Sequence, residues 1–574
     1  MNKLIVRRNN EYPLNEPSLP PLLQRIYGSR GIQNTKELER TLNGLESYQA
    51  MKGMPEAIAE IADAVVSAKR ILIVGDFDCD GATSSSLAVL ALRAMGAAWV
   101  DFLVPNRFQF GYGLSPEIVA VAAQKSPDLL ITVDNGISSI EGVQAAKELG
   151  MRVVVTDHHL PGKSLPEADA LVNPNQHGCD FPSKNLCGVG VIFYVMSALR
   201  RELQGRNWFQ SQGLEVPNMA SYLDLVALGT VADVVSLDQN NRILVEQGLR
   251  RIRAGAARPG ILALLSVAGR DHRKLVASDL GFAVGPRLNA AGRLEDMSIG
   301  IECLLSTDAD AANALAFQLD ELNQDRKRIE QSMQDQALNI LDNMALAGEA
   351  EMPAGLCLFD ASWHEGVIGI LASRIKERLH RPVIAFAQAE GGMIKGSARS
   401  IPKLHIRDAL DAVAARCPQL LSKFGGHAMA AGMSLRREDL DAFSQAFDEE
   451  VRRQLNDDDF QARIESDGEL AASELSLEMA QQLRDAGPWG QNFPEPLFDG
   501  VFNIVQQRIV GQRHLKLMLA EPGSGHCVDA IAFNVDTDVW PNTSQQARLA
   551  YKLDINEFRG RTSVQLMVDY LEPC

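Results

Sequence analysis

The sequence predicts an α/β protein with a parallel-sheet first domain, a long connecting helix, a smaller α/β domain and a C-terminal β-barrel. From about residue 55 to 300, short runs rich in Val, Ile and Leu alternate with helical patterns, which is typical of βα units. From about residue 460 onward, five short β-type runs are separated by turn residues. The 574 residues are enough for about three or four domains.

The composition excludes several classes of protein. With 46% hydrophobic and 22% charged residues it is typical of a globular chain, and no window is apolar enough for a transmembrane helix. The eight cysteines form no CxxC pairs, which argues against a structural zinc site and for a reducing, cytoplasmic location. The N-terminal segment lacks the apolar core of a secretory signal. The formal charge of −17 neither supports nor excludes nucleic acid as a partner, because a metal site would reverse the local field.

Polar side chains gather where the predicted strands end. The run ILIVG at 71–75 continues as GDFDCDG, the run DLLITVD at 128–134 continues as VDNG, and the run MRVVVTD at 151–157 continues as TDHH. Because the carboxyl ends of parallel strands share one edge of a sheet, these clusters should converge. A further aspartate follows an apolar helical run in GTVAD. The candidates are Asp76, Asp78, Asp80, Asp134, Asp157, His158, His159 and Asp233.

The conjunction of these residues favours a metal site. A lone strand-end aspartate is more often a turn former or helix cap, and a lone histidine can be a buried structural residue. Carboxylates alone would suit Mg²⁺, and an added imidazole moves the preference toward an ion such as Mn²⁺. One carboxylate between two metal positions would allow a bridged pair roughly 3.5–4 Å apart.

The four motifs GDFDCDG, VDNG, TDHH and GTVAD, in this order, resemble those of the DHH phosphoesterase superfamily. Over almost the whole chain the sequence is similar to the superfamily's bacterial exonucleases, which degrade single-stranded DNA from 5′ to 3′. The similarity includes the segments PNRFQFGYGLS, GPRLNAAGR, KGSARS, FGGHAMAAG and GPWGQNFPEPLF.

The resemblance implies roles for the clustered residues. Asp78 and Asp80 would each serve one of two divalent cations, Mn²⁺ or Mg²⁺, and Asp134 would bridge the pair. His158 and Asp233 would complete the site of the Asp80 metal. The remaining two catalytic candidates lie beside the metals: His159 would face the scissile phosphate, and Asp76 would orient a ligand or a water.

Residues from about 308 to 347 contain no Gly or Pro, and their apolar positions recur with a helical period. Thr307 or Asp308 can cap this helix, whose length would be on the order of 60 Å. We interpret it as a strut that joins two lobes.

The second lobe combines expected strands with two segments read as turns. KGSARS is expected to be a small-residue turn and FGGHAMAAG a Gly-rich turn, and both could be ordinary solvated loops. The resemblance implies a DHHA1-type domain in which Ser397, Arg399 and His427 hold substrate phosphates. Further candidates for substrate binding are Arg287, Asn289 and Arg293 in the cleft, and Arg107 and Tyr112 at the entrance.

The C-terminal runs fit a small barrel, for which an OB fold is the natural candidate. This region is net −7, with 9 Lys and Arg against 16 Asp and Glu, so no strongly basic face is evident. A local stripe for single strands remains open, as does a plain solvated surface. Its candidates are Arg508, Arg513, Lys516, Arg559 and Arg561, with Phe502, Phe533 and Tyr551 for base stacking.

These expectations define a domain map and a function. The map is an N-terminal extension packed on the first domain (1–50), a catalytic domain (51–305), a connecting helix (306–348), a substrate-binding domain (349–457) and a single-strand-binding barrel (458–574). The expected function is a metal-dependent 5′→3′ exonuclease for single-stranded DNA in repair and recombination, acting as a monomer. A single-strand-binding protein and a helicase are partners implied by the resemblance.

Two other functions stay open at this point. Relatives that hydrolyse short oligonucleotides or cyclic dinucleotides resemble only the first two lobes, so the C-terminal barrel favours a long polymer. A non-catalytic DNA-binding scaffold would lack metal carboxylates, and here every expected ligand is present.

Overall fold

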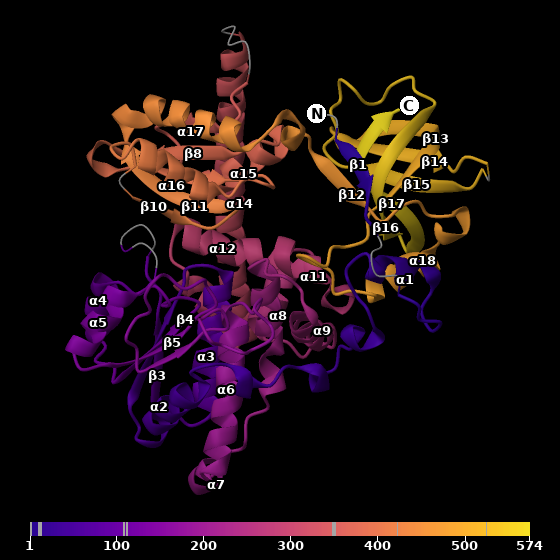
Figure 1. The fold of residues 1–574 in the computed structure, drawn as a ribbon. Helices are drawn as coiled ribbons and strands as arrows, with labels where there is room; N and C mark the ends of the chain where they lie inside the picture. Colours follow the sequence, from indigo (N-terminus) through magenta and orange to yellow (C-terminus); the bar gives the residue numbers. More distant parts are fainter. Residues whose placement is uncertain are drawn as a thin grey trace.

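The computed structural model describes residues 3–9, 14–106, 110, 113–346, 352–421, 423–523 and 525–574. Three lobes are visible in Figure 1: a large α/β lobe, a smaller α/β lobe, and a β-barrel beside them. A search of the described residues for helices long and apolar enough to span a membrane returned none. The predicted fold class is confirmed: the first sheet is parallel, the second lobe is α/β, and the C-terminal strands close into a barrel.

The first lobe is built on a five-stranded parallel sheet with the order β3-β2-β4-β5-β6. Alternate side chains of these strands face opposite layers, so near-continuous apolar runs are required. Leu72 and Leu130 pack against α4 and α5, whereas Ile71 and Ile131 share a core with α2, α3 and α6. The strands are β2 (Arg70–Gly75), β3 (Trp99–Leu103), β4 (Leu129–Val133), β5 (Arg152–Thr156) and β6 (Ala170–Val172).

Helices cover both faces of this sheet and extend the lobe on one side. Around the sheet lie α2 (Met54–Val66), α3 (Cys79–Ala94), α4 (Pro116–Ala123), α5 (Ile140–Glu148), α6 (Gly188–Gly205) and α7 (Trp208–Gln212). The chain continues through α8 (Leu223–Ala232), α9 (Gln239–Arg253), α10 (Pro259–Val267), α11 (Ala277–Asp279), a π-helical turn (Leu280–Val284), α12 (Gly285–Leu294) and α13 (Ser298–Leu305).

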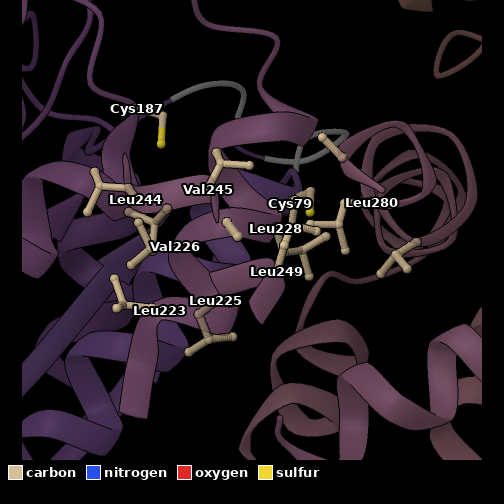
Figure 2. Packing of buried hydrophobic residues seen from close by; sticks show 14 of the residues in the cluster. Cys79, Cys187, Leu223, Leu225, Val226, Leu228, Leu244, Val245, Leu249 and Leu280 are labelled. Atoms are coloured by element: carbon tan, nitrogen blue, oxygen red, sulfur yellow. The ribbon is translucent and has the colours of Figure 1, made fainter. Parts of the chain in front are cut away.

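The helix pair α8 and α9 is anchored deep in the core of the first lobe. Figure 2 shows Leu228 of α8 beside Leu249 of α9 and Leu280. These side chains are fully or almost fully buried, with at most 1% of their surface exposed. This packing fixes the position of the C-terminal end of α8, which Asp233 directly follows.

The predicted strut is helix α14 (Ala309–Leu346), a single helix of 38 residues. Asp308 caps its start by accepting a hydrogen bond from the backbone N–H of Ala311 at 2.8 Å. Ala316 and Leu319 belong to the core of the first lobe, whereas Met333 and Ala337 belong to that of the second. One helix thus takes part in two cores, which ties the lobes together (Figure 1).

The second lobe has a five-stranded sheet with the order β10-β11-β9-β8-β7. Its strands are β7 (Leu356–Phe359), β8 (Val383–Gln388), β9 (Met393–Arg399), β10 (Lys423–Gly426) and β11 (Ala430–Arg436), with helices α15 (Ile368–Leu379), α16 (Ile406–Arg416) and α17 (Leu440–Gln454). The prediction that KGSARS is a turn was wrong. This segment forms most of the central strand β9. Its small residues fit a strand that is paired on both sides.

The C-terminal strands close into a barrel with the order β13-β14-β15-β17-β16. They are β13 (Phe498–Val510), β14 (His514–Ala520), β15 (Cys527–Ala532), β16 (Gln546–Phe558) and β17 (Arg561–Pro573), preceded by α18 (Leu477–Asp485). Two predicted stacking residues are wrong: Phe502 and Tyr551 are buried in the barrel core and cannot meet a base. Phe533 is half exposed, and Phe558, which the sequence analysis missed, is 62% exposed.

The N-terminal segment joins two lobes rather than packing on the first alone. Strand β1 (Leu4–Arg7) pairs in parallel with β12 (Arg463–Ser466), which precedes the barrel. After α1 (Pro21–Gly28), Arg30 forms a fully buried ion pair with Asp467 at 2.8 Å. Gln247 of α9 donates to the backbone carbonyl of Arg40 at 2.5 Å, so the same segment also contacts the first lobe.

Candidate metal centre and substrate face

The first motif forms the junction between β2 and α3. Asp78 is the N-cap of α3, and its Oδ1 accepts a hydrogen bond from the N–H of Gly81 at 3.0 Å. Asp76 lies just before, at the strand end, and accepts from the N–H of Phe77 at 2.8 Å. Asp80 lies in the first helical turn with 1% exposure. The alternate spacing therefore places all three carboxylates around one helix start.

The N-terminus of α6 supports the Asp80 carboxylate. The backbone N–H groups of Gly188 and Val189 donate to its two oxygens at 2.5 and 2.9 Å. A Cβ on Gly188 would lie 2.5 Å from the Cβ of Asp134, so only glycine allows this close approach. These donors were not predicted from the sequence, although the glycine-rich helix start GVGV was a signal for them.

The third motif is organised by its own aspartate. One oxygen of Asp157 accepts hydrogen bonds from the backbone N–H of His158 at 2.7 Å, the N–H of His159 at 3.1 Å and the ring Nδ1 of His159 at 2.8 Å. Its other oxygen accepts from the N–H of Ile137 at 2.9 Å. Asp157 thus orients both histidines and is itself turned away from the shared cluster.

The sequence-distant candidates do converge. The Nε2 atom of His158 lies 3.1 Å from Asp134, 3.5 Å from Asp233 and 3.9 Å from Asp80. Three groups have ligand atoms within 4.8 Å of one another: Asp80 with His158 and Asp233, Asp76 with Asp78 and Asp134, and Asp134 with both histidines. Asp134, whose backbone has a left-handed φ of 62°, belongs to two of them. Asp76 lies among the clustered carboxylates rather than behind them.

The electrostatics of the cluster call for a cation. Burial, together with the nearby charge of Asp78, raises the pKa of Asp80 to about 7. Burial and the neighbouring carboxylates raise the pKa of Asp134 and of Asp233 well above the usual range. Burial lowers the pKa of His158 to about 4, so its ring is neutral and able to bind a metal. Buried carboxylates with a neutral imidazole are a donor set that fits Mn²⁺ or Mg²⁺.

His159 differs from its neighbour. Burial alone would lower its pKa, but the hydrogen bond and charge of Asp157 outweigh burial and raise the pKa to about 9. Its side chain is also 45% exposed, against 12% for His158. His159 is therefore a cation at the open side of the cluster.

The second lobe contributes a face of opposite charge. Arg399 donates to the Oγ of Ser397 at 3.0 Å and to the carbonyl of Ala398 at 2.8 Å. Across the described part of the chain, no carboxylate forms an ion pair with this guanidinium. Burial and the positive charges of Arg399 and His159 lower the pKa of His427. The two lobes are in direct contact nearby, where Arg293 of α12 donates to the carbonyl of Gly366 at 3.2 Å.

The residues of the GPRLNAAGR segment in α12 have two kinds of contact: some hold neighbouring elements in place and some line a cavity. Asn289 accepts a hydrogen bond from the N–H of Cys79 at 2.7 Å and so holds the first motif, and Arg287 is paired with Asp320 at 2.7 Å. Asn289 and Arg293 line a cavity of about 500 Å³ between α12, α14 and α15. Arg107 and Tyr112, expected at the entrance, lie outside the described residues.

Comparisons with known proteins agree with this architecture. Three families match: the DHH family, N-terminal domain, at residues 70–230, the DHHA1 domain at 353–453, and the RecJ OB domain at 466–570. The chain is 57% identical over 557 residues to the single-stranded-DNA-specific exonuclease RecJ of Dickeya dadantii, covering 97% of this chain and 96% of that protein. The RecJ of Escherichia coli is 56% identical with the same coverage.

Solved structures give the same result. The crystal structure of RecJ in complex with Mn²⁺ from Thermus thermophilus has a TM-score of 0.79 and 29% identity, covering 97% of this chain and 76% of that one. A second structure, with Mg²⁺, has a TM-score of 0.73 and 28% identity. The fold and the carboxylate cluster are those of a DHH-family protein with a divalent-metal centre. Within that class, the chain belongs to the RecJ family.

Proposed function

We propose that this chain is a metal-dependent exonuclease that degrades single-stranded DNA from its 5′ end and releases 5′-mononucleotides. Two divalent cations, Mn²⁺ or Mg²⁺, would be held by Asp78, Asp80, Asp134, His158 and Asp233. The observation that carries the proposal is a pair of neighbouring ligand groups. One consists of Asp80, His158 and Asp233, the other of Asp76, Asp78 and Asp134, and His158 Nε2 lies 3.1 Å from Asp134.

The protein supplies a positioned, strongly acidic site. When bound, the cations would activate a water and polarise the phosphodiester. Asp134 belongs to one ligand group and contacts His158 of the other, which suits a bridging role, and the backbone donors of α6 keep Asp80 in place. Asp76 also falls within reach of a cation, so its role as a direct ligand is part of the proposal.

The cationic groups bind the phosphates. His159, charged at neutral pH and partly exposed, would donate a hydrogen bond to the scissile phosphate. Arg399, already oriented by Ser397, would bind a neighbouring phosphate with its fork of donors, and His427 would add a further contact. In this proposal, the acidic wall of the first lobe and the basic wall of the second lobe lie on opposite sides of one DNA backbone.

The wider role follows the family. Single-stranded DNA is the substrate named for the RecJ relatives, and a barrel of the RecJ OB type favours a long strand over a dinucleotide. We extend the proposal to repair and recombination in the cytoplasm, with the chain acting as a monomer beside a single-strand-binding protein and a helicase.

The test is product analysis on end-labelled DNA with added Mn²⁺ or Mg²⁺. We expect mononucleotides to be released from the 5′ end of single strands, with little release from blunt duplexes. A chelator should abolish the reaction. Release from the 3′ end, or cleavage confined to dinucleotides, would contradict the proposal and favour a short-oligonucleotide phosphodiesterase instead.

A further inference from the structure

The segment GPWGQNFP, residues 487–494, connects α18 to the barrel and lies against the loop that follows Asp233. The carbonyl of Gln491 accepts a hydrogen bond from the backbone N–H of Leu237 at 2.9 Å. The side chain of Asn492 donates to the Oγ of Ser236 at 2.6 Å. Both contacts fall within four residues of a metal-ligand candidate, although the segment is more than 250 residues away in sequence.

The loop between Asp233 and Leu237 holds an unfavourable backbone conformation. Val234 has a φ of 60°, in the left-handed region that β-branched residues rarely adopt. Its own side chain is 61% exposed, so packing of that side chain cannot impose the conformation. Such strain persists only when the surroundings over-determine it. The constraint must therefore come from the residues on either side.

The loop is held from two directions. Within the first lobe, α9 binds its carbonyls: Arg242 donates to Leu237 O at 2.8 Å and Asn241 to Ser236 O at 2.9 Å. From the other direction, the N–H of Leu237 and the hydroxyl of Ser236 form hydrogen bonds with the 487–494 segment. The side chain of Leu237, only 4% exposed, lies against Gly490. The segment thus completes the clamp that α9 begins.

Aromatic packing fixes the segment itself. Trp489 and Phe493 stack on each other at 5.1 Å between ring centroids, and both stack near Tyr27 at 6.0 and 6.2 Å. Arg242, which binds the Leu237 carbonyl, also lies 4.3 Å over the Phe493 ring. The N-terminal segment, the segment that leads into the barrel and the helix that holds the Asp233 loop therefore contact one another in one aromatic cluster.

We propose that residues 487–494 are a positioning element for the metal centre: by clamping Ser236 and Leu237 they hold Asp233 against Asp80 and His158. The barrel is then coupled to cation binding as well as to DNA. This inference rests on the proposed function, because it assigns Asp233 to a metal. Outer contacts that orient metal ligands typically change metal affinity about 10- to 100-fold when removed.

The test measures Mn²⁺ binding to the full chain without DNA, by following free Mn²⁺ with electron paramagnetic resonance. A Cβ on Gly490 would lie 2.7 Å from Leu237 Cδ1, so Gly490→Val should push Leu237 and shift the loop. We expect the Mn²⁺ dissociation constant to rise about 10-fold. Ser236→Ala, which only deletes the hydrogen bond to Asn492, should raise it about fivefold and leave folding unaffected.

Gly205→Val is the matched control, since nothing lies within 4 Å of a Cβ built at this glycine. Its Mn²⁺ affinity should equal that of the unmodified chain. Unchanged affinity in Ser236→Ala would overturn the inference, and so would an equal loss in Gly205→Val. If the unmodified chain bound Mn²⁺ but released no nucleotides, the proposed exonuclease would fail while this test remained decisive for the clamp.

Discussion

The metal centre and the substrate face of the second lobe are opposites in structure and in charge. The metal centre lies at the carboxyl edge of a parallel sheet, where carboxylates from three segments gather around a histidine from a fourth. The substrate face lies on a sheet whose central strand, β9, pairs antiparallel with both neighbours and carries Ser397 and Arg399. A parallel sheet collects sequence-distant residues at one edge, whereas a single strand presents residues close in sequence.

The difference in charge suits the proposed function, in which one wall binds a polyanion and the other cuts it. On the first lobe, burial and mutual repulsion raise the pKa of Asp80, Asp134 and Asp233, so this wall attracts cations. On the second lobe, Arg399 has only neutral partners among the described side chains, so that wall attracts anions. Variants on the two walls should therefore fail in different ways.

The largest effect is expected from the metal wall. Asp134→Asn keeps the shape of the side chain but removes the charge shared by two ligand groups. Nucleotide release with Mn²⁺ should fall by more than about 10³-fold, because the electrostatic stabilisation of the reacting phosphate is lost. Mn²⁺ binding should weaken as well, whereas the metal-free protein should unfold at a slightly higher temperature because a buried repulsion is relieved.

Asp342→Asn is the matched control, an exposed aspartate on α14. Its activity and unfolding midpoint should be unchanged. Full activity in Asp134→Asn would remove this residue from the site and with it the distinction between the two walls.

A smaller effect of another kind is expected from the substrate wall. Arg399→Ala should lower kcat/KM about 10- to 100-fold, the loss expected for hydrogen bonds to a charged phosphate. Mn²⁺ affinity should stay the same, because Arg399 is not part of any ligand group. Arg399→Lys should recover part of the loss, since it restores the charge without the fork. Steady-state kinetics and Mn²⁺ titration together check this, and a parallel loss of metal affinity would contradict it.

The contrast also decides how much the sequence could predict. The metal wall was predictable from residue types, because each ligand follows a recognisable apolar run and parallel strands share an edge. Asp80, Asp134, His158 and Asp233 converge as expected. The supporting donors were not predictable in the same way: backbone N–H groups such as that of Gly188 are present at every residue, and only the fold shows which of them point at Asp80.

The other regions were harder to predict for physical reasons. KGSARS consists of small and charged residues that are common in turns, and only pairing on both sides reveals it as a central strand. In the barrel, the alternation of side chains does not tell which face closes inward. Phe502 and Tyr551 are in the core, whereas Phe558 is outside.

An effect smaller again is expected at the barrel. Phe533 and Phe558 are 50% and 62% exposed, so they can stack on bases without unfolding. Changing either to Ala should weaken binding to a long single strand about 5- to 10-fold and leave hydrolysis of a short strand unchanged. Fluorescence anisotropy checks the first effect, with Leu160→Ala, 73% exposed on the first lobe, as the control. If binding to the long strand and hydrolysis of the short strand were reduced equally, the two rings would have a structural role and not a role in base stacking.

The smallest effect concerns the pH dependence of DNA binding through His427. Burial and nearby positive charge keep its pKa below the usual value, so the free protein carries it neutral at pH 7. A bound phosphate favours the protonated ring. DNA affinity should therefore rise as pH falls through this pKa, and this gain should disappear when the pH is raised again. Between neutral pH and about pH 5, the gain should be a few-fold in the unmodified chain and smaller in His427→Asn. Anisotropy in the presence of a chelator isolates this wall from the metals, and identical pH profiles for the two proteins would exclude His427 from the phosphate contacts.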